Sequence, residues 1–129
     1  MTNKSSLQVQ KESALDFLHL VVTGSIDEAY DKYVNMRGKH HNVCYSAEFI
    51  SLKQGMIENN AQFPNKRLMV KNVLGDGNLV AIHSNIVMKM GEPGIATVHI
   101  FRFEEGRIVE MWDIGQAIPI DTPNRMGAF

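Results

Sequence analysis

Residues 95–116 read IATVHIFRFEEGRIVEMWDIGQ, and this stretch decides the fold of the chain. Two runs rich in Val, Ile and Phe, 95–104 and 107–116, flank the short turn Glu105-Gly106, which is the pattern of a β-hairpin. A turn this short joins antiparallel strands, because a parallel crossover needs about a dozen residues or more. We therefore predict two antiparallel strands here.

Two further strand segments precede this hairpin. Residues 67–74 and 79–90 are similarly apolar, and each is followed by a turn with two glycines, 75–78 and 91–94. Glycine permits the backbone conformations that tight turns require. Together with the hairpin, these segments predict a four-stranded antiparallel meander.

The first part of the chain carries helical patterns instead. Apolar residues recur at helical spacing in 8–23, and Gly24 ends this segment. Ser25 and Glu28 form a capping-box pattern, in which each side chain satisfies a free backbone N–H. The pattern predicts a short second helix, 26–34.

A loop and a third helix separate these two helices from the strands. Residues 35–45 have no hydrophobic period and are interpreted as a loop. Ser46 can cap a third helix, which frays near Phe63-Pro64 because the residue before a proline is pushed out of helix. Helices followed by an antiparallel meander predict an α+β fold.

The chain has 129 residues, which suits one domain. We expect a disordered N-terminus at residues 1–7. A single domain would follow over residues 8–129, with a C-terminal tail at 117–129 that has no clear period. This tail would wrap over the domain or over a partner.

Composition and charge exclude several classes of protein. Apolar residues make up 44% and charged residues 21%, and the net charge is −1, so no field of one sign attracts nucleic acid or an anionic membrane. No apolar run approaches the ~20 residues of a membrane helix. The single cysteine, Cys44, cannot form an intramolecular disulfide, and no zinc-finger spacing is present. We expect a cytoplasmic protein without a metal site.

The hairpin also resembles a known family. Residues 98–113, VHIFRFEEGRIVEMWD, look like the closing hairpin of the SnoaL-like polyketide cyclase family, within the nuclear-transport-factor-2-like (NTF2-like) superfamily. The chain resembles the uncharacterised aldol-condensation branch of that family over nearly its whole length. Outside the hairpin, the residues that carry the resemblance are His41-Asn42, Asp76-Gly77, His83, Gln116 and Pro119.

The resemblance implies a fold, a pocket and a class of reaction. It implies a cone-like curved antiparallel sheet wrapped around about three helices, with an apolar pocket inside and a homodimer formed through the sheet. The named cyclases close a ring by an intramolecular aldol condensation without metal or organic cofactor. In them, a side-chain acid/base takes a proton next to a carbonyl.

This chain departs from the family pattern at two positions. The cyclases place an aspartate, their acid/base, three residues before the hairpin arginine, and here that residue is His99. Many relatives carry a histidine just before the Trp-Asp pair, and here that residue is Met111. The usual proton-transfer group is therefore replaced.

Three residues are candidates for catalysis. Imidazole has a pKa of about 6.5, close to working pH, so His99 is the first candidate for the acid/base and His83 the second. The two would share a face if their strands pair in register, although simple alternation puts His83 on the wetter face. Asp113 would act as base or orient a histidine. The alternative for all three is an ordinary structural hydrogen bond.

Five residues are candidates for binding the substrate. The resemblance places His41 and Asn42 near the pocket mouth. Phe101, Met111 and Trp112 would line the pocket wall, and their alternative is a core role.

Other polar residues have structural interpretations. Arg102 and Glu110 lie symmetrically about the hairpin turn, which predicts a salt bridge across strands on the outer face of the sheet. His40 is interpreted as a surface loop residue.

Three functions remain open on the sequence alone. The first is a lyase, isomerase or cyclase that moves a proton next to the carbonyl of a small apolar ligand, without a cofactor. The second is a non-catalytic binder of a small hydrophobic ligand in the same pocket. The third is a dimeric module that contacts another protein through its outer sheet or its tail.

Overall fold

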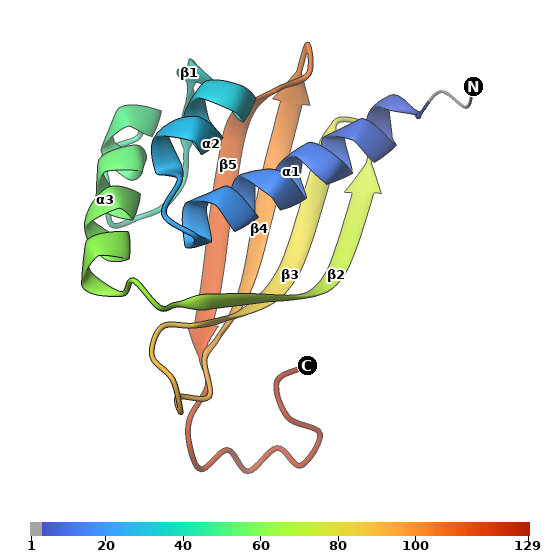
Figure 1. The fold of residues 1–129 in the computed structure, drawn as a ribbon. Coiled ribbons are helices and arrows are strands. Elements are labelled where there is room, and N and C mark those ends of the chain that lie inside the picture. The colour runs from blue at the N-terminus through green and yellow to red at the C-terminus, as the bar shows by residue number, and fades with distance from the viewer. Residues whose placement is uncertain (1–3) are drawn as a thin grey trace.

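The computed structural model describes residues 4–129 and contains three helices and five strands. The helices and strands occur in the order α1–α2–β1–α3–β2–β3–β4–β5 (Figure 1). Their bounds are α1 Ser6–Val22, α2 Ile26–Tyr33, β1 Val34–His40, α3 Phe49–Gln62, β2 Arg67–Asp76, β3 Leu79–Val87, β4 Ile95–Glu104 and β5 Arg107–Ala117. None of these helices is long and apolar enough to cross a membrane.

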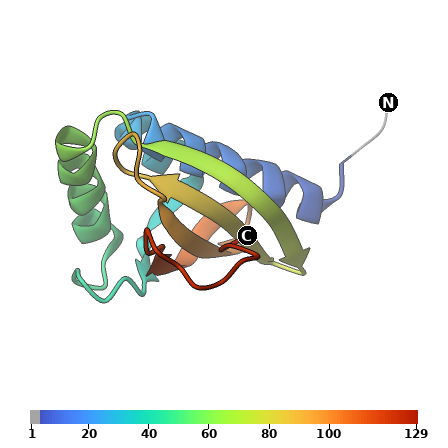
Figure 2. The same ribbon diagram turned by 90° about the horizontal axis from the view of Figure 1, so that it is seen from below.

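The five strands form one curved sheet in the order β1-β5-β4-β3-β2. Strands β2 to β5 are antiparallel neighbours, which confirms the predicted meander and the α+β fold. Helix α1 lies across the concave face of the sheet, and α3 lies beside the β1 edge (Figures 1 and 2). The helices and the sheet therefore enclose a space on the concave side, and none of the three described helices lies on the convex side.

Strand β1 is the main difference from the prediction, which placed a loop at 35–45. Residues 34–40 instead pair in parallel with β5. A Cβ at Gly38 would collide with the backbone carbonyl of Val109, so this close approach depends on glycine. The prediction failed because β1 is stabilised by pairing with residues about 70 positions away rather than by a local period.

The helix starts also differ from the prediction. Helix α1 begins at Ser6, and the Ser5 side chain accepts a hydrogen bond from the backbone N–H of Gln8 at 3.1 Å. Residues 4–7 are therefore ordered by a helix cap, while residues 1–3 of the expected disordered segment lie outside the described residues. Ser25 is the N-cap of α2 but makes no side-chain cap bond, so the predicted capping box is absent.

Buried aromatic rings join the helices to the sheet. Phe17 of α1 makes edge-to-face contacts with Tyr30 of α2 and Phe101 of β4, at centroid distances of 5.4 and 5.8 Å. Tyr30 contacts Phe49 of α3 in the same way, at 6.2 Å. These rings fill the middle of the enclosed space, so any cavity has to lie to one side of them.

The C-terminal residues leave the sheet after β5. Beyond Ala117 the chain forms no helix or strand, and it passes on the side of the sheet opposite the helices (Figure 2). Its last ring, Phe129, lies 5.4 Å from the His83 ring and 4.9 Å from Lys71 Nζ. The tail therefore folds back onto β2 and β3.

We predict that Phe101→Ala lowers the free energy of unfolding by about 3–5 kcal/mol, because it leaves a cavity among the aromatic rings. Chemical denaturation measures this loss. The matched control is Ile50→Ala, since Ile50 lies on the exposed side of α3 and is 62% exposed; its change is about 0.5 kcal/mol or less. Equal losses in the two variants would contradict the packing described here.

Candidate functional site

A cavity of about 220 Å³ lies between the helices and the concave face of the sheet. Its walls come from α1, α3, β3, β4, β5 and the two segments that flank α3. Most of the lining is apolar, with a few polar groups, which is the usual composition of a small-molecule site. The polar residues of the lining are Asn42, Tyr45, Asn59, Lys66, His99 and Asp113.

His99 and Asp113 lie side by side in this cavity. They are register partners on β4 and β5, and directly opposed residues of antiparallel strands place their Cβ atoms about 4.5–5.5 Å apart. His99 is 7% exposed. Within residues 4–129, its Nδ1 is buried and has no hydrogen-bond partner. Such an unsatisfied polar atom costs free energy, and a ligand with a polar group would relieve that cost.

Two opposing effects set the charge of His99. Burial lowers the pKa of the imidazole, and the negative charge of Asp113 raises it by less, so the pKa lies below its usual value of 6.5. Neutral imidazole is therefore favoured at neutral pH, with one nitrogen as donor and one as acceptor. This is the protonation state that a general base requires.

The loop before α3 holds Asp113 in place. Asn42 Nδ2 donates to Asp113 Oδ2 at 2.8 Å, and Asn42 Oδ1 accepts from the backbone N–H of Cys44 at 2.9 Å. The backbone N–H of Asn42 donates to His40 Nδ1 at 3.1 Å. His40 Nε2 must then carry the proton, and it donates to the carbonyl of Ser46 at 2.5 Å.

His40 corrects one sequence prediction. It is buried rather than a surface loop residue, because it ends β1 and both ring nitrogens bond the loop backbone. It fixes the conformation in which Asn42 reaches Asp113.

Lys66 was missed by the sequence analysis. It lies in the segment between α3 and β2, lines the cavity, and donates from Nζ to Asn59 Oδ1 at 2.6 Å. Burial lowers the pKa of its ammonium group. No period or motif marks Lys66 in the sequence, since only the packing of the turn after Pro64 brings its side chain to the cavity.

His83 lies on the opposite face of the sheet from His99. Ile82, not His83, is the register partner of His99. The His83 ring bonds Asn72 Nδ2 at 3.0 Å and lies against Phe129. The prediction of one face for both imidazoles is therefore wrong, and the alternation that put His83 on the wetter face is confirmed.

Four of the five expected binding residues do not line the cavity. Phe101 and Met111 are core residues, 0% and 1% exposed, that are paired with each other across β4 and β5. Trp112 lies on the outer face, where its ring stacks on His41 at 5.0 Å. Asn42 is the one expected binding residue that lies on the cavity wall.

The outer face of the hairpin carries a cluster of charges around Glu110. Arg102 Nε donates to Glu110 Oε1 at 2.9 Å, which confirms the predicted salt bridge across the strands. His41 Nε2 contacts Glu110 Oε2 at 2.6 Å. These contacts lower the pKa of Glu110, most of all the bond from His41, and they hold His41 away from the cavity.

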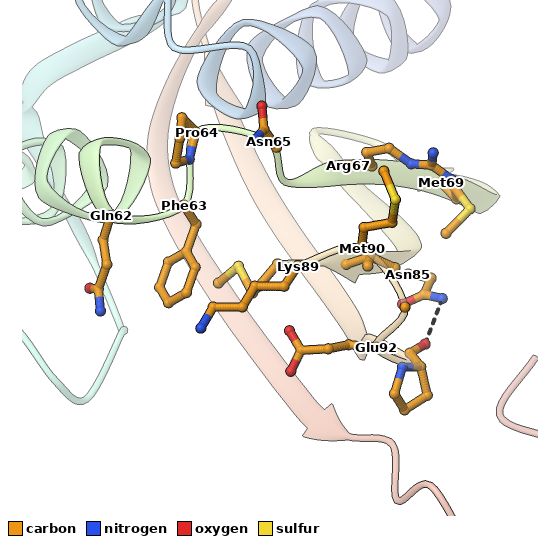
Figure 3. A pocket seen from close by; sticks show the side chains of 14 residues that line it. Gln62, Phe63, Pro64, Asn65, Arg67, Met69, Asn85, Lys89, Met90 and Glu92 are labelled. Atoms are coloured by element: carbon orange, nitrogen blue, oxygen red, sulfur yellow. Dashed lines mark hydrogen bonds between the residues drawn. The ribbon is translucent and has the colours of Figure 1, made fainter.

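A second hollow has a volume of about 510 Å³, and Figure 3 shows the side chains that line it. It lies between the segment after α3 and the β3–β4 turn, and its walls include Phe63, Lys89 and Met90. Met88 lines both hollows, so this single flexible side chain lies between them. In the described part of the chain, no three His, Cys, Asp or Glu side chains gather so as to hold a metal ion.

We predict that His99 makes stability depend on pH. Because its pKa is lower in the folded than in the unfolded state, the unfolded state takes up a proton first as pH falls. The contribution of His99 to the free energy of unfolding is therefore largest above a pH of about 6.5. As the pH decreases from there, the free energy of unfolding decreases by at most about 1.4 kcal/mol per pH unit for one proton. Urea denaturation at several pH values measures this slope.

The variant His99→Gln serves as the comparison for this slope. As the pH decreases below about 6.5, its free energy of unfolding should decrease less steeply than that of the unsubstituted protein. The reason is that glutamine does not titrate, so unfolding no longer takes up a proton at position 99. Identical slopes would show that His99 titrates alike in both states.

Solved structures of other proteins share this fold. An NTF2-like protein of unknown function from Cytophaga hutchinsonii superposes with a TM-score of 0.67 at 17% identity, over 89% of this chain and 93% of that chain. A proposed polyketide cyclase from Acidithiobacillus ferrooxidans gives 0.69 at 18% identity, over 90% and 92%. IdmH from Streptomyces antibioticus, also a proposed polyketide cyclase, gives 0.66 at 19% identity, over 83% and 92%.

Sequence comparisons add no closer relative: no protein family matches the chain, and no curated protein matches it. The structural likenesses confirm the fold that the resemblance of the hairpin implies. At 17–19% sequence identity, these likenesses establish the architecture, and the chemistry has to be argued from the residues of the site. The chain has the NTF2-like α+β fold, in which a curved sheet encloses helices.

Proposed function

We propose that the chain is a SnoaL-like enzyme that transfers a proton next to the carbonyl of a small, mainly apolar compound, without metal or organic cofactor. The observation that carries this proposal is the buried, unpartnered imidazole nitrogen of His99 beside Asp113 in an apolar cavity. The reaction would be an isomerisation, an elimination or a ring closure, since each begins with the same proton abstraction.

His99 is the proposed base. Its neutral imidazole would take a proton from the carbon next to the carbonyl, and the electron pair of that C–H bond would move onto the carbonyl oxygen as an enolate. The fixed negative charge of Asp113 would stabilise the imidazolium that forms. In a substrate with an adjacent carbon–carbon double bond, the imidazolium would return the proton to a different carbon of the dienolate, which completes an isomerisation. In a substrate with a second carbonyl, the enolate carbon would attack that carbonyl to close a ring, and the imidazolium would protonate the alkoxide that forms.

The enolate oxygen needs hydrogen-bond donors in a site that excludes water. Asn42 uses one N–H on Asp113, and its amide nitrogen has a second one. Tyr45, which has a hydroxyl donor, also lines the cavity. The cavity volume is below the roughly 300–1,000 Å³ of drug-sized sites, which supports a small ligand.

We predict that the protein accelerates exchange of the α-hydrogens of hexan-2-one for deuterium in D₂O, and that His99→Ala lowers the rate about 10²–10⁴-fold. Proton NMR follows the loss of the α-hydrogen signals. The matched control is His83→Ala, which removes an imidazole from the outer face and keeps the rate.

Two results would contradict this assignment. An unchanged rate in His99→Ala would remove His99 as the base. Binding of hexan-2-one without exchange in the unsubstituted protein would identify a binder instead of an enzyme.

We also propose a homodimer through the outer face of the sheet. Leu74 and Ile114 are 64% and 60% exposed on this face, and Trp112 lies beside Ile114 in β5. Apolar side chains gathered on one face of a sheet are typical of an interaction surface.

We also propose that the protein is located in the cytoplasm. The exposed thiol of Cys44, which forms no disulfide, supports this, because thiols stay reduced in that compartment.

We predict that Ile114→Glu produces a monomer, because a charge at the centre of an apolar interface is buried without a partner. Light scattering coupled to size-exclusion chromatography measures the mass. Ile50→Glu, on the exposed side of α3, controls for the added charge. A monomeric unsubstituted protein would refute the dimer and leave the cavity chemistry untouched.

A further inference from the structure

We propose that the ligand of the inner cavity is an oxo acid, whose carboxylate pairs with Lys66 while its carbonyl faces His99. This inference rests on the proposed function, because it names the class of substrate for the same site. It assigns Lys66 the role of determining specificity and orientation.

Lys66 lines the cavity and forms no ion pair with any residue of the described part of the chain. Its Nζ has three N–H donors, and one donates to the neutral amide oxygen of Asn59. By contrast, Lys53 of α3 forms an ion pair with Asp27 at 2.9 Å. A partly buried ammonium group without an anion is unfavourable, and a bound carboxylate would neutralise it.

The polar groups of the cavity also give a ligand one orientation. Asp113 lies on the β5 wall and already accepts a hydrogen bond from Asn42, whereas Lys66 follows α3 on another wall. A ligand carboxylate is repelled by Asp113 and attracted by Lys66. An oxo acid would therefore enter with its carboxylate at Lys66, which leaves the opposite end of the molecule for His99.

Burial lowers the pKa of the Lys66 ammonium group, because it disfavours the charged form. A bound carboxylate would offset this cost. The same burial strengthens an ion pair with a ligand, because less water screens it. The two N–H groups that Asn59 does not use are available to a carboxylate, which accepts through both oxygens.

The experiment compares two probes of nearly equal size. Isothermal titration calorimetry would measure the dissociation constants of 5-oxohexanoate and of its neutral amide, 5-oxohexanamide. We expect the protein to bind the acid at least about tenfold more tightly than the amide, as for a charge pair shielded from water. Lys66→Met should abolish this preference, and Lys66→Arg should retain part of it, because it keeps the charge.

Lys4→Met is the matched control for net charge, since Lys4 is exposed and far from the cavity lining. It should keep the full preference for the acid. Circular dichroism checks that each variant folds, and the comparison of acid with amide in the unsubstituted protein tests the proposal without any variant.

Three results would overturn the inference: no preference for the acid, no binding of either probe, or an unchanged preference in Lys66→Met. Each is separate from failure of the proposed function, which is tested with the neutral ketone hexan-2-one and with His99→Ala. Exchange of the ketone without a preference for the acid would leave His99 as the base and remove the role of Lys66.

Discussion

The antiparallel register between β4 and β5 is the constraint on which the rest of the structure depends. It sets His99 opposite Asp113 on the concave face and Arg102 opposite Glu110 on the convex face. Side chains alternate along a strand, so a slip of one residue would exchange the two faces. Both the cavity and the outer charge cluster therefore follow from one pairing.

The register is held from both sides of the sheet. On the outside, Arg102 and His41 bond the two oxygens of Glu110, and such charge-assisted bonds fix the geometry of the strand pair. On the inside, Phe101 packs edge-to-face on Phe17 of α1. The helices thus cover the face that carries the imidazole, and this burial lowers the pKa of His99.

The cavity has a charge at each of two walls. Asp113 supplies the negative one and is held by Asn42. Lys66 supplies the positive one, and within residues 4–129 its side chain bonds only the neutral amide of Asn59. His99 lies beside the negative charge of Asp113. This charge favours the protonated imidazole and so raises the pKa of His99, against the larger decrease that burial causes. The selectivity proposed for Lys66 and the base proposed at His99 thus depend on residues of different elements, and each can be substituted without the other.

The features that depend on residues close together in the chain are predictable from the sequence. Glycine turns and alternating apolar residues predict β2 to β5, and the symmetric placement of Arg102 and Glu110 about their turn predicts the salt bridge. The resemblance of the hairpin implies the α+β cone and singles out His99. Alternation along 79–90 puts His83 on the wetter face of its strand, but the folded structure alone shows which face of β3 the helices cover. It also shows that residues 34–40 form β1 and that Lys66 lines the cavity. Those outcomes depend on pairing and packing between distant segments, for which no local period exists.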